Sequence, residues 1–183
     1  MLQRLYDNWV YGGFLMGLVL LALWPLFKLS LSWSGALVLL ALSAYAIHQY
    51  EEHDADRFRA FVNTTMAKGR AGLSKADVFY INVLLVWCLL ALNIWLVERV
   101  NAGWALLGAL LLLVNAATHI GYTLLTRQPN PGVWTAALLF LPLGIYMLLQ
   151  VWPLASFIQF VICLVVVLGI HAWIFAHARR SVA

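Results

Sequence analysis

Six long apolar segments constrain the fold of this 183-residue sequence more than any other feature. A helix that crosses a bilayer needs about 20 mostly apolar residues. The apolar residues of these segments are continuous rather than alternating, which disfavours membrane-spanning strands. We therefore predict an all-α, polytopic membrane helix bundle of about six spans, folded as a single domain over residues 1–183. The predicted spans are Trp9–Phe27, Trp33–Tyr50, Val78–Val97, Trp104–Leu125, Trp134–Gln150 and Leu154–Ala176.

The positive charges predict the orientation of the bundle, because cytoplasmic connections favour Lys and Arg. The even-numbered connections and both termini carry Arg4, Arg57, Arg59, Lys68, Arg70, Lys75, Arg127, Arg179 and Arg180. The opposite face of the predicted bundle carries only Lys28 and Arg99. Both termini are therefore predicted to be cytoplasmic. The net charge of +4 is explained by topology and anionic lipid, and no nucleic-acid partner is expected.

The longest polar connection, over about residues 53–76, carries apolar side chains at near-helical spacing. They predict a short amphipathic helix on the cytoplasmic surface, with a solvated linker as the alternative. Ser74 and Asp77 resemble a capping box that starts the third span. The apolar residues of this predicted helix are Phe58, Phe61, Val62 and Met66.

Three histidines are predicted to reach the same depth in the membrane. His48 lies 15 residues after Trp33, and His119 lies 15 residues after Trp104, on spans that run in the same direction. His171, in the last span, is at a comparable level. Polar groups at membrane depth are costly and usually face a partner or a water-filled cavity. Glu51 and Glu52 follow His48 by one helical turn, and Asn115 precedes His119 by one turn.

These residue types predict a divalent metal site, zinc or iron, held by His48, Glu52, His119 and His171. Glu51 would act as general base toward a metal-bound water. Asn115 would orient His119 or a substrate carbonyl. The reverse assignment of the two carboxylates, with Glu51 as the ligand, stays open.

Each residue also has a structural interpretation. Glu51 and Glu52 could mark the water boundary, with His53 following in solvent. Asn115 and His119 could hold helices together by hydrogen bonds, and His171 could be a packing histidine.

The segment His48-Gln49-Tyr50-Glu51-Glu52 resembles the bacterial membrane family named for its HXXEE motif. The resemblance extends to Asn115 and His119, to residues 127–136 with Pro131-Gly132 and Thr135-Ala136, and to His171. It implies a multi-span protein of the bacterial inner membrane, and it brings no activity. The order Glu51-Glu52, His119, His171 is also loosely similar to the CAAX-protease-like intramembrane proteases, although Asp56, Asn115 and Phe175 depart from their pattern.

The predicted function is an intramembrane, metal-dependent, hydrolase-like enzyme that acts on a lipid or another apolar substrate. An iron site that carries out oxidation is compatible with the same ligands. One alternative is a cation- or proton-coupled carrier, which would use the same His and Glu residues. The other is a structural membrane subunit without catalysis. The substrate and the oligomeric state do not follow from the sequence.

Overall fold

The structure, a computed structural model, describes residues 2–65, 67 and 72–179. Met66, Lys68, Arg70 and Arg180, which entered the predictions above, lie outside these residues. In the described part the chain is helical throughout, with no strand, which confirms the all-α prediction. The elements are α1 (Leu2–Ser30), α2 (Trp33–His53), η1 (Asp54–Asp56), α3 (Arg57–Thr65), α4 (Lys75–Phe79), η2 (Tyr80–Trp87), α5 (Cys88–Arg99), η3 (Ala102–Ala105), α6 (Leu106–Thr126), α7 (Val133–Thr135), η4 (Ala136–Phe140), α8 (Leu141–Val151), η5 (Trp152–Leu154) and α9 (Phe157–Ala178).

Five helical segments of the described chain are long and apolar enough to cross a membrane: Leu2–Ser30, Lys75–Arg99, Ala102–Thr126, Val133–Leu154 and Phe157–Ala178. Their outward side chains are large and apolar: Leu15 is 62% exposed, Leu138 76% and Val165 64%. An apolar outer surface of this extent suits lipid rather than water as the surrounding solvent. The fold is therefore that of a polytopic integral membrane protein.

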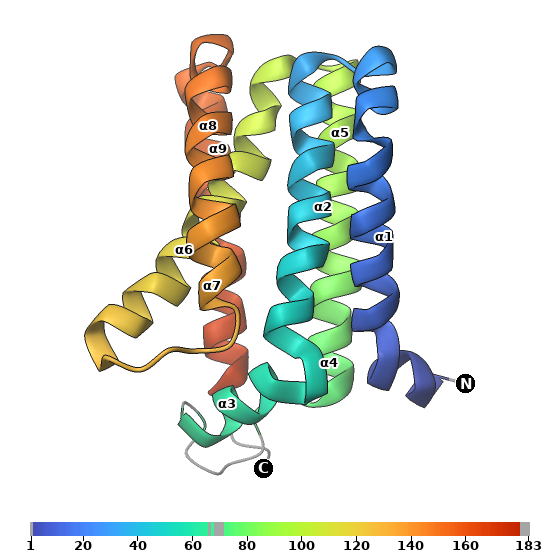
Figure 1. Cartoon of the computed structure of the whole chain (residues 1–183). Coiled ribbons are helices and arrows are strands. Elements are labelled where there is room, and N and C mark those ends of the chain that lie inside the picture. Colours follow the sequence, from blue (N-terminus) through green and yellow to red (C-terminus); the bar gives the residue numbers. More distant parts are fainter. Residues whose placement is uncertain (1, 66, 68–71, 180–183) are drawn as a thin grey trace.

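Helix α2 is the most enclosed long helix, and it carries the HXXEE segment. It has 21 residues, and most of them are buried. It runs beside α1 and also packs on α5, α6 and α8 (Figure 1). Surrounded in this way, α2 can carry polar side chains at its end because the other helices shield them from lipid. Because this end is polar, the mean hydropathy of α2 is lower than that of the five segments above.

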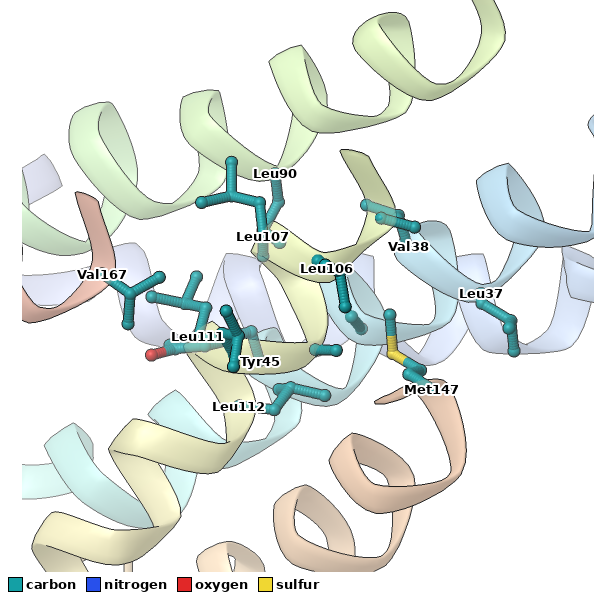
Figure 2. Close-up of a cluster of buried hydrophobic side chains, with 14 of the residues drawn as sticks. Leu37, Val38, Tyr45, Leu90, Leu106, Leu107, Leu111, Leu112, Met147 and Val167 are labelled. Atoms are coloured by element: carbon teal, nitrogen blue, oxygen red, sulfur yellow. The ribbon is translucent and has the colours of Figure 1, made fainter. Parts of the chain in front are cut away.

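The main apolar core lies along α2 and α6. Figure 2 shows Tyr45 of α2 close to Leu111 of α6, with side chains from α5, α8 and α9 completing the cluster. Leu106, Leu112 and Met147 are almost fully buried. This packing fixes how α2 and α6 are rotated relative to each other, and so it determines which of their polar residues meet.

The chain leaves α2 through η1 and enters α3, whose apolar side faces the bundle. Ala55 and Asp56 adopt positive φ angles of 52° and 62°, and Asp56 forms an ion pair with Arg59. Val62 is 2% exposed, because α3 packs beneath the bundle end. At the start of α4, Ser74 and Asp77 form the predicted capping box.

The beginning of α1 and the end of α9 lie at the same end of the bundle (Figure 1). Lys75 Nζ lies 2.6 Å from Asp7 Oδ1, and His177 Nε2 lies 3.3 Å from Asp77 Oδ1, so both ends contact the start of α4. We expect this end to be cytoplasmic. A reporter fused after Ala183 should then read as cytoplasmic and one inserted near Asn101 as external. An external reading after Ala183 would contradict the orientation.

Candidate metal centre

Three buried side chains from α2 and α6 converge at the end of the core. His48 Nε2 lies 3.6 Å from Glu52 Oε2, and His119 Nε2 lies 3.4 Å from Glu52 Oε1. His48 is 0% exposed, Glu52 6% and His119 7%. One potential ligand atom from each residue lies within 4.8 Å of the other two. His48 and Glu52 are one helical turn apart, so α2 alone places them on the same face.

The hydrogen bonds of His48 define which of its ring nitrogens carries the proton. The Thr135 hydroxyl lies 2.5 Å from Glu51 Oε2 and 2.7 Å from His48 Nδ1. An ionised carboxylate can only accept hydrogen bonds, so the hydroxyl donates its hydrogen bond to Glu51. Its oxygen then accepts from His48 Nδ1–H. His48 Nε2 is left with a free lone pair, and it has no hydrogen-bond partner of its own.

His119 is held in the same tautomer by Asn130. The Asn130 Nδ2 group donates to the His119 carbonyl oxygen at 2.8 Å and to Thr123 Oγ1 at 3.1 Å. These two acceptors fix the orientation of the amide, so Oδ1 faces the imidazole and accepts from Nδ1–H at 2.6 Å. His119 Nε2 therefore points toward Glu52, 3.4 Å from its Oε1.

Glycine 132 lets the connection between α6 and α7 approach both imidazoles. Its φ angle of +92° lies in the left-handed region that favours glycine. A Cβ atom at this position would lie 2.8 Å from His48 Cε1 and 3.0 Å from His119 Cε1. One short segment, with Asn130, Gly132 and Thr135, thus positions both histidines.

The arrangement offers lone pairs from two imidazoles and one carboxylate to a common point. Charge-assisted N–H···O bonds are about 2.7–2.9 Å long, so both His–Glu52 separations exceed that range. Two ligands bound at about 2.1 Å to a tetrahedral ion lie roughly 3.4 Å apart. The His119 Nε2–Glu52 Oε1 separation of 3.4 Å and the His48 Nε2–Glu52 Oε2 separation of 3.6 Å are close to this value, each to a different carboxylate oxygen. A second residue that fixes the tautomer of each ligating histidine is usual at metal centres. The donor set of His48, His119 and Glu52 therefore fits zinc or iron.

Of the residues predicted for the site, His171 and Asn115 lie farther from this point. Both line a cavity of about 170 Å³ that begins at Glu52 and His119. His171 Nδ1 donates to the Val167 carbonyl at 2.8 Å, and His171 is not among the three convergent ligands. Asn115 Nδ2 donates to the Tyr45 hydroxyl at 3.0 Å, while Asn115 Oδ1 is buried without a partner. The residue that orients His119 is thus Asn130 rather than Asn115.

Glu51 points away from the cavity, toward the start of α7. It accepts hydrogen bonds from the backbone N–H groups of Trp134 at 3.1 Å and Thr135 at 2.7 Å, besides the Thr135 hydroxyl. A carboxylate at a helix N-terminus is stabilised by the helix dipole. With these donors in place, Glu51 serves as a helix cap and holds Thr135, and it does not face a water in the cavity.

Sequence reasoning missed four residues of the centre. His53 is 6% exposed rather than solvated; its Nε2 lies 3.0 Å from Glu52 Oε2, and its ring contacts those of Trp9 and Phe58. The others are Asn130, Gly132 and Thr135. The Pro-Asn-Pro-Gly run at 129–132 is a turn signal shortly after His119, and it could have drawn attention to this connection.

The fold and the site define a polytopic membrane protein with a buried His/Glu cluster that could hold a metal ion. The chain belongs to the family described as proteins of unknown function with an HXXEE motif, whose model matches residues 39–147. The matched region includes His48, Glu51, Glu52, His119 and the connection that orients the histidines. No curated protein matches the chain, and no solved structure matches it.

Proposed function

We propose that the protein is a metal-dependent hydrolase of a bacterial inner membrane that acts on an apolar substrate. The observation that carries this proposal is the convergence of His48, Glu52 and His119, with both imidazole Nδ1 atoms hydrogen-bonded to Thr135 and Asn130 and both Nε2 atoms facing Glu52. Three protein ligands with a further position open to a cavity are typical of catalytic rather than structural zinc sites. The cavity reaches Glu52 and His119 directly.

A divalent ion at this centre would activate a bound water for attack on a carbonyl carbon. In the proposed reaction His53, which lines the cavity and whose Nε2 lies 3.0 Å from Glu52 Oε2, would accept one proton of that water. The water oxygen would bond to the carbonyl carbon as the bond to the leaving oxygen or nitrogen breaks, and His53 would return the proton to that leaving atom. Asn115 lines the cavity too, and its buried, unpartnered Oδ1 would accept a hydrogen bond from the water or the substrate.

Metal analysis of the purified full-length protein tests the centre. We expect one zinc per chain in the wild type, less than a tenth of that in His48→Ala and His119→Ala, and an unchanged content in the matched control His177→Ala. His177 lies outside the cluster, near the end of α9, where its Nε2 contacts Asp77 of α4. Equal metal content in all four proteins, or none in the wild type, would overturn the metal centre.

Hydrolysis of p-nitrophenyl laurate in detergent micelles tests the reaction class. The wild type should hydrolyse this ester, and His53→Gln should keep its zinc while losing at least tenfold in rate. General acid–base groups typically contribute that much or more. Stoichiometric zinc without hydrolysis of ester or amide substrates, or iron in place of zinc, would overturn the assignment as a hydrolase.

A further inference from the structure

The cavity beside the metal centre has two unlike walls. Helices α2 and α6 supply Glu52, Asn115 and His119, so this wall is polar. The facing wall is mostly apolar and comes from α4, η2, α9 and α3, with Ile81, Ile170 and Val62 among its members besides the polar Asn82 and His171. A molecule that fits both walls has an apolar body and a polar group in one position along it.

The shape of the cavity limits the apolar body to one chain. The part lined by α9 runs from Ile170 to Ala178, which spans about 12 Å at the rise of an α-helix. The cavity volume is about 170 Å³ over that length. A volume of this size over that length favours one extended chain as the apolar body.

The end of the cavity nearest the chain termini is closed by packing. Val62, Leu73, Val78 and Ala178 form a buried apolar cluster there, and the contact of His177 with Asp77 joins α9 to α4. Along the rest of its length α9 packs on α6 and makes few close backbone approaches to α4, η2 and α5. This sparsely packed seam lies at membrane depth, so the route for an apolar chain leads from the bilayer.

The polar wall favours an uncharged polar group. Among the described lining residues the one acidic side chain is Glu52, and none is a lysine or an arginine. Proteins that bind phosphate groups commonly use Arg or Lys for this purpose. The remaining polar side chains of the wall are amides, imidazoles and hydroxyls, which suit a neutral ester, amide or alcohol.

We propose that the cavity binds a neutral, single-chain lipid of the monoacylglycerol type, with its chain against Ile81 and Ile170 and its carbonyl at Glu52 and His119. The ligand enters from the bilayer along the seam between α9 and the helix Lys75–Arg99. The proposal rests on the proposed function for the placement of the carbonyl. It adds the substrate class and the route of entry.

Photolabelling of the full-length protein in detergent tests this inference. The probe is a monoacylglycerol with a diazirine at its chain end, and labelled peptides are mapped by mass spectrometry. Labels should fall on peptides that contain residues 78–86 and 170–178. Ile170 is half-buried in the cavity wall, and the larger side chain of Ile170→Trp fills part of the cavity. This variant should lower the labelling at least tenfold. Val165→Trp is the matched control, since Val165 is on the same helix but faces outward and is 64% exposed.

A lysophosphatidate probe with the same chain separates the neutral from the phosphorylated class. We expect it to label the same peptides at no more than a tenth of the level of the neutral probe. Equal labelling by both probes, or labelling that Ile170→Trp leaves unchanged, would overturn the inference. Zinc content, measured on the same samples, separates the two proposals. A wild type that holds zinc but is labelled only on its surface lacks the chain site, whereas a zinc-free wild type that is labelled in the cavity lacks the metal centre.

Discussion

Glu52→Gln is expected to abolish metal binding while the protein still folds. The amide is nearly isosteric with the carboxylate, so the packing of α2 is preserved. Its Nε2–H group can donate to the lone pair of His48 or His119, which a carboxylate cannot do. The change removes the negative charge and one ligand together. We expect the dissociation constant for zinc to rise by more than about 100-fold, above the range of about 10–100-fold seen when an outer-shell partner is lost.

Thermal unfolding distinguishes this outcome from a general loss of stability. A ligand that binds the folded state at 100 times its dissociation constant stabilises the fold by about 2.7 kcal/mol. Added zinc should therefore raise the melting temperature of the wild type and leave that of Glu52→Gln unchanged. A zinc-dependent shift of equal size in both proteins would mean that Glu52 is not a ligand.

The neighbouring carboxylate provides the matched comparison. Glu51→Gln keeps the ligands but replaces one carboxylate oxygen by an N–H₂ group, so one of the backbone N–H groups of Trp134 and Thr135 faces a donor instead of an acceptor. With the N–H₂ group in the place of Oε2, the Thr135 hydroxyl also loses the oxygen to which it donates, and its hydrogen bond with His48 is weakened. We expect zinc affinity to fall by about 10–100-fold, an outer-shell effect smaller than that of Glu52→Gln. With Glu51 as the general base predicted from the sequence, the change would instead leave zinc affinity unaltered.

The fold followed from physical constraints that act locally along the chain. Apolar segments of spanning length are readable because lipid tolerates few alternatives to a closed helix. The shared depth of His48 and His119 followed from helix rise and from the common direction of their spans. The same argument about depth also predicted His171 as a ligand. His171 lines the cavity from α9, but its ring donates a hydrogen bond to the Val167 carbonyl of its own helix.

Two features depended on tertiary structure that the sequence does not show. Glu51 and Glu52 differ by about 100° around α2, but which of them faces the histidines depends on how α2 packs against α6 and α7. The roles of Asn130 and Thr135 depend on the path of a connection with a left-handed residue. No periodic pattern marks such a path, so polar residues inside the spans drew attention while those of the connection did not.

Gly132→Ala is expected to disrupt the centre although residue 132 provides no ligand. The left-handed backbone costs a non-glycine residue roughly 1–2 kcal/mol. The new Cβ would also press on His48 Cε1 and His119 Cε1. Neither imidazole can move away freely, because Thr135 and Asn130 hold their Nδ1 atoms. We expect less than a tenth of the wild-type zinc content and a lower melting temperature.

Gly121→Ala is the matched control, because it makes the same change on α6 two residues after His119. A Cβ at residue 121 meets nothing within 4 Å, and alanine is favoured over glycine in a helix by up to about 1 kcal/mol. This variant should keep its zinc and melt at the wild-type temperature or above. If Gly132→Ala also keeps full zinc content, the imidazoles are free to shift, and the connection does not preorganise the centre. Loss of zinc in Gly132→Ala alone would show that a backbone segment without a ligand decides whether the two histidines can share an ion.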